Sequence, residues 1–343
     1  MRGMAGLRRV TGEIYWSGCP SSYTLERARD EDVQLVVNLT YECTDYSLPE
    51  GMKLLHYPIP DFGFVPPEDF LLNVVIPLSE YIPEGKKVLI HCVGGIGRSG
   101  TAIAMLLVYF YCFDPSKALY RVFRLGGGPQ SAIQEVAFRW FSRLAKIRHR
   151  GALIGVLGFA AKRTFGAGIE HASTVANISL DILEVLEEKY NVDERDKAAA
   201  YVGGLLHDIA KKQDDARHHI LGAEIAKKLK TIDELADRNL VSKVILHHRR
   251  KTDMLEDKEL VSLGEGAVLS AAAVRLADAF KSAYIGEGTY WRTMLKDNVL
   301  SVSGIPSSVN QFKEKSEALS RFTGLRVELD ESALRYYSGF FMI

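Results

Sequence analysis

Residues 91–101 read HCVGGIGRSGT, with Cys92 and Arg98 six positions apart. The segment between them is rich in glycine, which reaches positive φ without steric cost and lets a ligand approach the backbone closely. Such a loop can fold into a cup whose N–H groups point at phosphate oxygens, while the planar guanidinium of Arg98 can bind two of those oxygens. Apolar residues predict a buried strand before the loop and a helix after it, so a positive helix N-terminus faces the same point. We therefore predict a phosphate-binding loop formed by Val93, Gly94, Gly95, Ile96, Gly97 and Arg98.

The same surroundings determine the chemistry of the thiol. Inward N–H groups, a helix N-terminus and an arginine each favour the anion, so we expect Cys92 to be a thiolate at neutral pH and a nucleophile toward phosphorus. A buried structural cysteine is the ordinary alternative. That alternative leaves the glycines, Arg98 and Ser99 unexplained.

The segment His91–Thr101 resembles the signature loop of the cysteine-dependent protein tyrosine and dual-specificity phosphatases. Residues 10–148 as a whole resemble the small archaeal members of that family. The resemblance implies a two-step reaction without a cofactor, in which a cysteinyl phosphate is formed and then hydrolysed. It also implies that the Ser99 hydroxyl bonds the cysteine sulfur and that His91 supports the loop from behind.

Both steps of such a reaction need proton transfer by a carboxylate. Asp61 lies in a turn-rich segment, Pro58–Pro66, about thirty residues before the cysteine, and it matches the acid loop of the family. A plain turn aspartate is the alternative, because Pro-Asp-x-Gly is ordinary turn chemistry. Asp69 and Glu68 are the other acids that could take the role.

Residues 128–134, GPQSAIQ, resemble the family segment that places the water for the second step. Gln134 is the better match and Gln130 the weaker one, and an exposed glutamine at a helix start is the alternative. The predicted phosphate loop contains no lysine, so nothing in it favours a highly charged inositol phosphate over a phosphoprotein.

The second half of the chain contains a different set of polar side chains. It includes an adjacent His207-Asp208 pair inside the apolar segment Leu205–Ala210. Burying an imidazole and a carboxylate there without partners would destabilise the fold by roughly several kcal/mol. A divalent metal would supply the missing partner, because imidazole and carboxylate together suit such ions.

The order His, His-Asp, Asp across residues 165–285 resembles the HD superfamily of metal-dependent phosphohydrolases. The resemblance implies a basic metal site formed by His171, His207, Asp208 and Asp278. It further implies that His218 and either His247 or His248 serve a second metal, and that Lys211 contacts a phosphate. The expected cofactor is a divalent ion, Mn, Fe, Mg, Ni or Co, which would activate the attacking water directly.

Element patterns predict two domains. Strands alternating with helices over residues 11–148 predict an α/β domain with a mostly parallel sheet flanked by helices. Beyond it nearly every segment has a helical period, which predicts an all-α HD domain. We place the phosphatase domain at residues 1–150 and the helical domain at 151–343. The latter ends in a tail after about residue 286 without a recognisable motif, apart from a strand predicted at 325–329.

Length, charge and cysteine content indicate which partners and which cellular compartment to expect. A length of 343 residues suits two domains, and 43 basic against 43 acidic residues give no general attraction to DNA or to a membrane. The four cysteines show neither a disulfide framework nor a CxxC pair, which favours a reducing compartment. The amino terminus does not read as a secretion signal, and no apolar run reaches the length of a membrane helix. We therefore expect a cytoplasmic protein.

These observations predict a phosphotyrosine or phosphoester phosphatase fused to a metal-dependent phosphohydrolase that acts on a nucleotide or small phosphoester. Two alternatives remain open. The HD half could be a non-catalytic, nucleotide-sensing module that regulates the phosphatase. The first half could remove phosphates from RNA 5′ ends, although the balanced charge and the lack of a basic, aromatic groove count against that reading.

Overall fold

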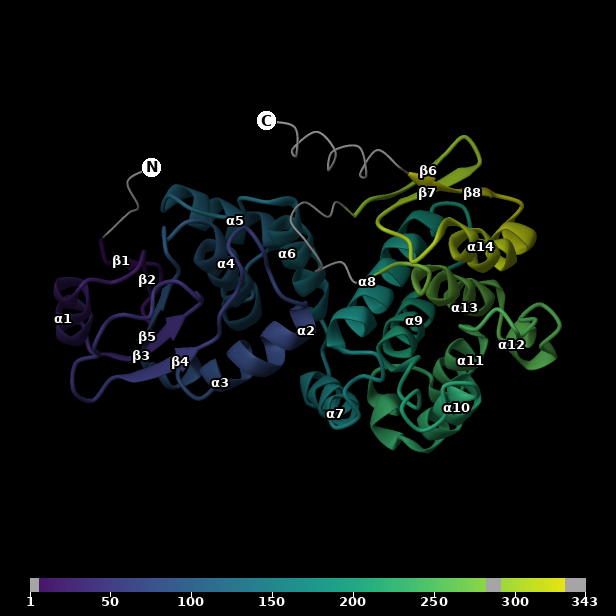
Figure 1. Ribbon diagram of the computed structural model, residues 1–343, viewed down its shortest axis with the longest axis horizontal. Coiled ribbons are helices and arrows are strands. Elements are labelled where there is room, and N and C mark those ends of the chain that lie inside the picture. Colours follow the sequence, from purple (N-terminus) through teal and green to yellow (C-terminus); the bar gives the residue numbers. More distant parts are fainter. Residues whose placement is uncertain (1–5, 282–290, 331–343) are drawn as a thin grey trace. The chain divides into compact units, whose positions relative to one another are not determined.

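The computed structural model describes residues 6–281 and 291–330. The chain divides into two compact units, with the division between Ile147 and Arg148 (Figure 1). Within the described residues, no helix combines the length and the apolar character needed to cross a bilayer.

The first unit is built on a five-stranded sheet. Its strands are β1 (Arg8–Arg9), β2 (Ile14–Ser17), β3 (Val33–Asn38), β4 (Lys53–His56) and β5 (Lys87–His91), in the order β1-β2-β5-β3-β4. All neighbours pair in parallel except β1 with β2. Because parallel strands end at the same edge, the segments that follow β2, β3 and β5 meet there.

Helices complete the first unit. They are α1 (Ser22–Asp30), α2 (Pro67–Phe70), the π-helical η1 (Leu71–Val75), α3 (Ile76–Leu78), the short η2 (Ile82–Glu84), α4 (Gly97–Tyr111), α5 (Pro115–Arg124) and α6 (Ala132–Leu144). Helix α4 starts inside the glycine loop and is buried along nearly its whole length. Burial of α4 against the sheet therefore fixes the position of the loop at its N-terminus.

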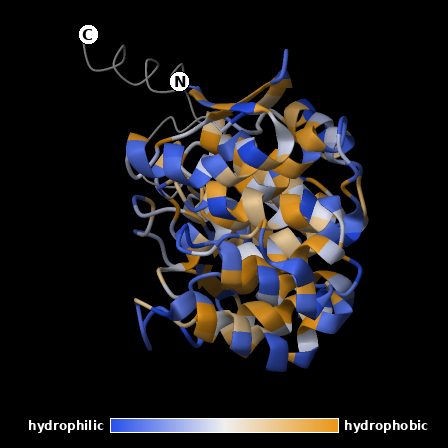
Figure 2. Cartoon of the chain, turned by 90° about the vertical axis from the view of Figure 1, so that its right-hand side faces the viewer, coloured by the Kyte–Doolittle hydropathy of each residue, from blue (hydrophilic) through white to orange (hydrophobic). Residues whose placement is uncertain are grey.

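The second unit is a helical bundle. Its helices are α7 (Arg150–Ala161), α8 (Ile169–Leu186), α9 (Glu194–Leu206), α10 (His218–Lys228), η3 (Lys230–Glu234), α11 (Arg238–His247), α12 (Lys258–Ser262) and α13 (Glu265–Ala277). Figure 2 shows hydrophilic and hydrophobic residues interspersed on the helices that face the viewer. A capping box between Asp193 and Asp196 starts α9, and Gly204 lets that helix approach α8 closely, because a Cβ there would lie 2.6 Å from the Cα of Ala176.

The carboxyl-terminal tail forms a small layer of its own. Strands β6 (Thr293–Lys296) and β7 (Val299–Ser303) are antiparallel, and β8 (Arg326–Asp330) joins β7 in parallel after helix α14 (Val309–Thr323). The predicted strand at 325–329 corresponds to β8. Phe280 contacts both Trp291 and Phe312, and α14 packs on α13. The described tail is thus a ββαβ segment attached to the bundle.

The cysteines require a correction. Cys19 and Cys43 form a disulfide, with their Cα atoms 5.9 Å apart, so the expectation of a chain without disulfides was wrong. The physical reason is the strand order: Cys19 follows β2 and Cys43 follows β3, and both strands flank β5. Residue spacing alone does not reveal this order. The cysteines therefore no longer support a reducing compartment.

Candidate active sites

Cys92 lies at the end of β5, where the glycine loop begins. Its side chain is buried, and its Sγ lies 3.1 Å from the Oγ of Ser99 at the start of α4. Gly95 has φ of +63°, and a Cβ there would lie 2.6 Å from the backbone nitrogen of Gly18. The loop therefore needs glycine at this position for both its conformation and its fit against the chain after β2.

Arg98 is buried and its guanidinium lies among acceptors from two other loops. Nη1 donates to Glu42 Oε2 at 3.0 Å and to the carbonyl of Ile59 at 3.0 Å, and Nη2 pairs with Asp61 Oδ1 at 3.0 Å. Burial acts to raise the pKa of Glu42, but the Arg98 guanidinium and backbone hydrogen bonds together outweigh burial, and the pKa is lowered. Arg98 is thus held in a fixed orientation by two carboxylates and a backbone carbonyl.

The three predicted acid candidates lie in different surroundings. Asp61 is exposed and contacts Arg98, so its carboxylate reaches the phosphate loop. Asp69 instead accepts from the Tyr57 hydroxyl and from Asn73 Nδ2, and burial raises its pKa. Glu68 is fully buried. The structure therefore brings only Asp61 of these three into contact with the arginine of the loop.

Gln130 and Gln134 both lie against the loop at Gly97. A Cβ on Gly97 would lie 2.6 Å from Gln130 Oε1 and 3.0 Å from Gln134 Oε1. The side chain of Gln134 is buried, donates to the carbonyl of Gly63 and accepts from the backbone N–H of Gln130. Gln134 therefore connects the Asp61 loop to the start of α6.

His91 is the last residue of β5 and directly precedes Cys92. Burial lowers its pKa to about 4, so the ring is neutral near pH 7. Nδ1 donates to the carbonyl of Cys92, and Nε2 accepts from the Tyr46 hydroxyl at 2.8 Å. The ring thus supports the backbone of the nucleophile.

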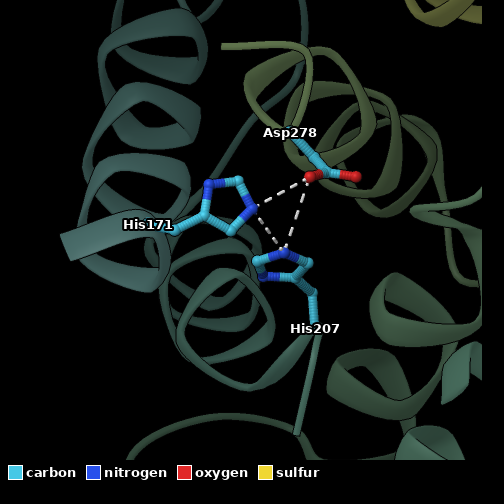
Figure 3. Close-up of side chains that lie close together, drawn as sticks. All are labelled: His171, His207 and Asp278. Atoms are coloured by element: carbon cyan, nitrogen blue, oxygen red, sulfur yellow. Dashed lines mark hydrogen bonds and ion pairs between the residues drawn. The ribbon is translucent and has the colours of Figure 1, made fainter. Parts of the chain in front are cut away.

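In the second unit, His171, His207 and Asp278 converge from α8, the end of α9 and the end of α13, and we call them triad one (Figure 3). The Nε2 atom of His171 lies 3.1 Å from Asp278 Oδ1 and 3.3 Å from His207 Nε2. His207 Nε2 lies 3.6 Å from the same carboxylate oxygen. Three ligand atoms therefore face one point.

Asp208, His218 and His248 form triad two. His218 Nε2 lies 3.1 Å from both Asp208 Oδ1 and His248 Nε2. The two triads are neighbours, because His207 Nε2 lies 3.6 Å from Asp208 Oδ2 and the His207 ring contacts the His248 ring.

The tautomers of these histidines fit a metal site. His207, His218 and His248 each direct Nδ1 to a backbone carbonyl at 2.7 Å, of Gly204, Asp215 and Ile245 respectively. A neutral ring that donates from Nδ1 has only a lone pair at Nε2. The Nε2 atoms of His218 and His248 therefore face each other as two acceptors, an arrangement that a shared cation satisfies.

A lysine holds the outer oxygen of each triad carboxylate. Lys211 Nζ lies 2.8 Å from Asp208 Oδ2, and Lys315 Nζ contacts Asp278 Oδ2 and lies 2.8 Å from its carbonyl. Burial acts to raise the pKa of Asp208 and Asp278, but the neighbouring histidines and lysines keep both well below the usual range. Both carboxylates are thus ionised and available to a cation.

The side chain of His247 has different partners from that of the adjacent His248. Its Nε2 contacts Asp257 Oδ2 at 2.8 Å, beside Lys243. Burial lowers the pKa of His247. Of the two adjacent histidines, only His248 joins a triad.

Glu42 at the phosphatase site and Lys315 at the metal site were missed in the sequence. Glu42 follows the buried strand β3, and it reaches Arg98 because β3 lies next to β5, an order that the sequence alone does not show. Lys315 lies in the motif-free tail, and no local pattern marked it.

Two protein-family models match separate parts of this chain. Residues 11–111 match the family model described as "polymorphic toxin system, DSP-PTPase phosphatase", and residues 168–283 match that of the HD domain. The chain joins a tyrosine and dual-specificity phosphatase domain to an HD domain.

The phosphatase domain also resembles individual proteins. It is 32% identical over 125 residues to a putative tyrosine phosphatase 067L of invertebrate iridescent virus 3, covering 33% of this chain and 50% of that protein. It is 30% identical over 127 residues to the tyrosine-protein phosphatase CDC14 homolog of Schizosaccharomyces pombe, covering 35% of this chain and 24% of that protein. The chain thus spans half or less of the length of these curated relatives.

Among solved structures, Tk-PTP in its active form is 35% identical. The match covers 40% of this chain and 97% of that chain, with a TM-score of 0.37.

Proposed function

We propose that the phosphatase domain hydrolyses phosphotyrosine or a related phosphoester through a cysteinyl phosphate on Cys92. The observation that carries the proposal is the cluster of Cys92 Sγ, the Ser99 hydroxyl and the buried Arg98 guanidinium around one glycine loop. The thiolate attacks phosphorus, and the bond from phosphorus to the substrate oxygen breaks. Arg98 binds the phosphate oxygens during both steps.

Asp61 supplies the proton in this proposal. A phosphate that takes over Nη2 of Arg98 displaces Asp61 from its ion pair and leaves the carboxylate free to turn to the leaving oxygen. The acid protonates that oxygen in the first step and accepts a proton from water in the second. Glu42 remains on Nη1 and keeps the guanidinium oriented. Gln134, between the Asp61 loop and the phosphate loop, is the residue we expect to place the water.

A phosphoprotein is the substrate class that we favour. The loop residues between Cys92 and Arg98 carry no positive side chain that could bind additional phosphates on an inositol ring. The aromatic side chains of Tyr41 and Phe62 are exposed next to the two carboxylates that hold Arg98.

The test is turnover of p-nitrophenyl phosphate in EDTA, which removes any metal-dependent contribution. Cys92→Ser should abolish this turnover, because an alcohol is not ionised under these conditions. The exposed free Cys112 is the matched control, and Cys112→Ser should retain full activity. Full activity of Cys92→Ser in EDTA would refute the proposed mechanism.

We also propose that the HD domain is a metal-dependent phosphohydrolase for a nucleotide or small phosphoester. The supporting observation is the pair of triads whose Nε2 and carboxylate atoms converge on two neighbouring points. Divalent metals at such sites polarise a phosphoryl oxygen and make water a stronger nucleophile. The triads would hold the ions, and Lys211, which is partly exposed beside Asp208, would contact a substrate phosphate.

This second proposal is best tested in the Cys92→Ser chain, where the first site is silent. A panel of nucleotides and phosphomonoesters should include one that is hydrolysed with added Mn²⁺ and not in EDTA, and His207→Ala should remove that activity. Nucleotide binding without hydrolysis, together with an altered rate of the phosphatase domain in the wild type, would instead assign the HD domain a regulatory role.

A further inference from the structure

Trp16 lies at the phosphatase site although no sequence signal pointed to it. It belongs to β2 and is fully buried. Its indole Nε1 donates to Ser99 Oγ at 2.7 Å, and the same oxygen lies 3.1 Å from Cys92 Sγ. A continuous chain of hydrogen bonds thus runs from the indole to the nucleophile.

The direction of this chain follows from chemistry. An indole N–H can only donate, so Ser99 Oγ is the acceptor in the first bond. Its own proton is then available to the sulfur, and a thiolate can only accept. We propose that Trp16 is a positioning residue that orients the Ser99 hydroxyl to donate to the Cys92 thiolate. The proposal deepens the phosphatase function and rests on it.

The indole ring is held rigidly enough for this role. The Arg8 guanidinium stacks over the ring at 3.8 Å from its centroid, while Arg8 Nη2 donates to the Gly95 carbonyl at 2.7 Å. Gly127 lies against the ring, because a Cβ on it would lie 2.5 Å from Trp16 Cη2. The ring that orients Ser99 is therefore fastened to the phosphate loop itself.

The contact matters most in the second step of the proposed reaction. Water forms a bond to phosphorus and passes a proton to Asp61, the sulfur–phosphorus bond breaks, and its electron pair stays on sulfur. A Ser99 proton directed at the sulfur stabilises the negative charge that develops there. The indole keeps that proton in place before the charge appears, so little reorganisation is needed.

The test measures the thiol and not turnover. In a Cys112→Ser background, iodoacetamide alkylation of Cys92 is followed against pH by mass spectrometry. Trp16→Phe keeps an aromatic ring but removes the donor, so the midpoint of the profile should move to higher pH by about half to one unit and the rate at acidic pH should fall about three- to tenfold. Trp140→Phe, which removes another fully buried indole of the same domain, should leave the midpoint unchanged.

A double-mutant cycle separates positioning from general damage. In a Ser99→Ala chain the indole has no hydroxyl to orient, so Trp16→Phe should cause no further shift. An equal shift with and without Ser99, or no shift in either background, would overturn the proposal. If the wild type lacked phosphatase turnover while the coupled shift persisted, the assigned activity would fail and the inference about the thiol would stand.

A measurement on the native tryptophans covers the case in which Trp16→Phe does not fold. In ¹⁵N-tryptophan-labelled protein, the indole N–H resonance of Trp16 should titrate with the same midpoint as the alkylation profile. That titration should vanish in Cys92→Ser, while the Trp140 resonance stays constant. A Trp16 resonance that ignores the ionisation of Cys92 would contradict the proposal.

Discussion

The two sites of this chain differ in whether backbone or side chains form them. The phosphatase site is a loop between β5 and α4, where glycine and backbone determine the shape and one cation, Arg98, is the principal charge. The HD site has no such loop, and its side chains project from the ends of five helices, α8, α9, α10, α11 and α13, and the segments next to them toward two neighbouring points. The first arrangement suits a bound anion, and the second suits bound cations.

The charges that surround each site are inverted in the same way. Arg98 is held by two carboxylates, whereas the carboxylates Asp208 and Asp278 are each held by a lysine. In both cases the partner fixes the orientation of a buried charge before a ligand binds. Changes to these partners should thus separate the two sites.

The largest effect is expected for the acid of the phosphatase site. Asp61→Asn should lower kcat for phosphotyrosine peptides by about 10²- to 10⁴-fold, because it removes the proton donor, while metal content stays unchanged. Asp69→Asn is the matched control and should act weakly, since Asp69 contacts Tyr57 and Asn73 instead of Arg98. Steady-state kinetics in EDTA give the comparison, and a stronger effect at Asp69 would reassign the acid.

Metal stoichiometry should distinguish the triads from each other. His171→Ala should remove the ion at triad one, and His248→Ala the ion at triad two, because each variant leaves only two ligands at its own point. His247→Ala should keep both ions, since its ring faces Asp257. Elemental analysis of the purified variants provides the counts. Loss of metal from His247→Ala, with retention in His248→Ala, would exchange the roles of the two histidines.

A smaller effect is expected for the lysine that comes from the tail. Lys315→Met frees Asp278 Oδ2 and the Asp278 carbonyl, so the carboxylate loses its orientation and metal affinity at triad one should fall about 10- to 100-fold. Lys313→Met, at an exposed position on the same helix, should bind metal like the wild type. Isothermal titration with Mn²⁺ measures both, and tighter binding in Lys315→Met would mean that its charge opposes the ion more than it orders the ligand.

Sequence reasoning found contiguous features and missed those that depend on strand order or tertiary contacts. The buried strand and the helix predicted on either side of the glycine loop are β5 and α4, and the loop was recognisable because its chemistry lies within eleven residues. Helix α5 was not predicted, although Asp114 caps it in the usual way. The triads could be predicted in part, because their adjacent His207-Asp208 pair stands out in an apolar segment.

The missed partners share a physical reason. Trp16, Glu42 and Lys315 each act on a group more than thirty residues away in the chain. The disulfide of Cys19 with Cys43 likewise depends on two strands that are separated by β5. Such contacts follow from tertiary packing, and no periodicity or local motif records them.

The smallest effect concerns acid stability, and it belongs to the phosphatase side alone. Burial holds the pKa of His91 at about 4, below the 6.5 of an exposed histidine. Between these two values the histidine is protonated in the unfolded chain and neutral in the folded domain. The free energy of unfolding should therefore fall as the pH decreases from about 6.5 toward 4, by at most about 3 kcal/mol from this group. His91→Gln should flatten that slope even if it lowers stability at pH 7. His56→Gln, at an exposed position, should preserve most of it, because burial lowers the pKa of His91 more than the charge of His56 does. Urea unfolding in a Trp291→Phe background, where fluorescence reports on Trp16 and Trp140, gives the slope. EDTA should not change it, since no triad residue belongs to this domain, and a slope that survives in His91→Gln would exclude this histidine as its source.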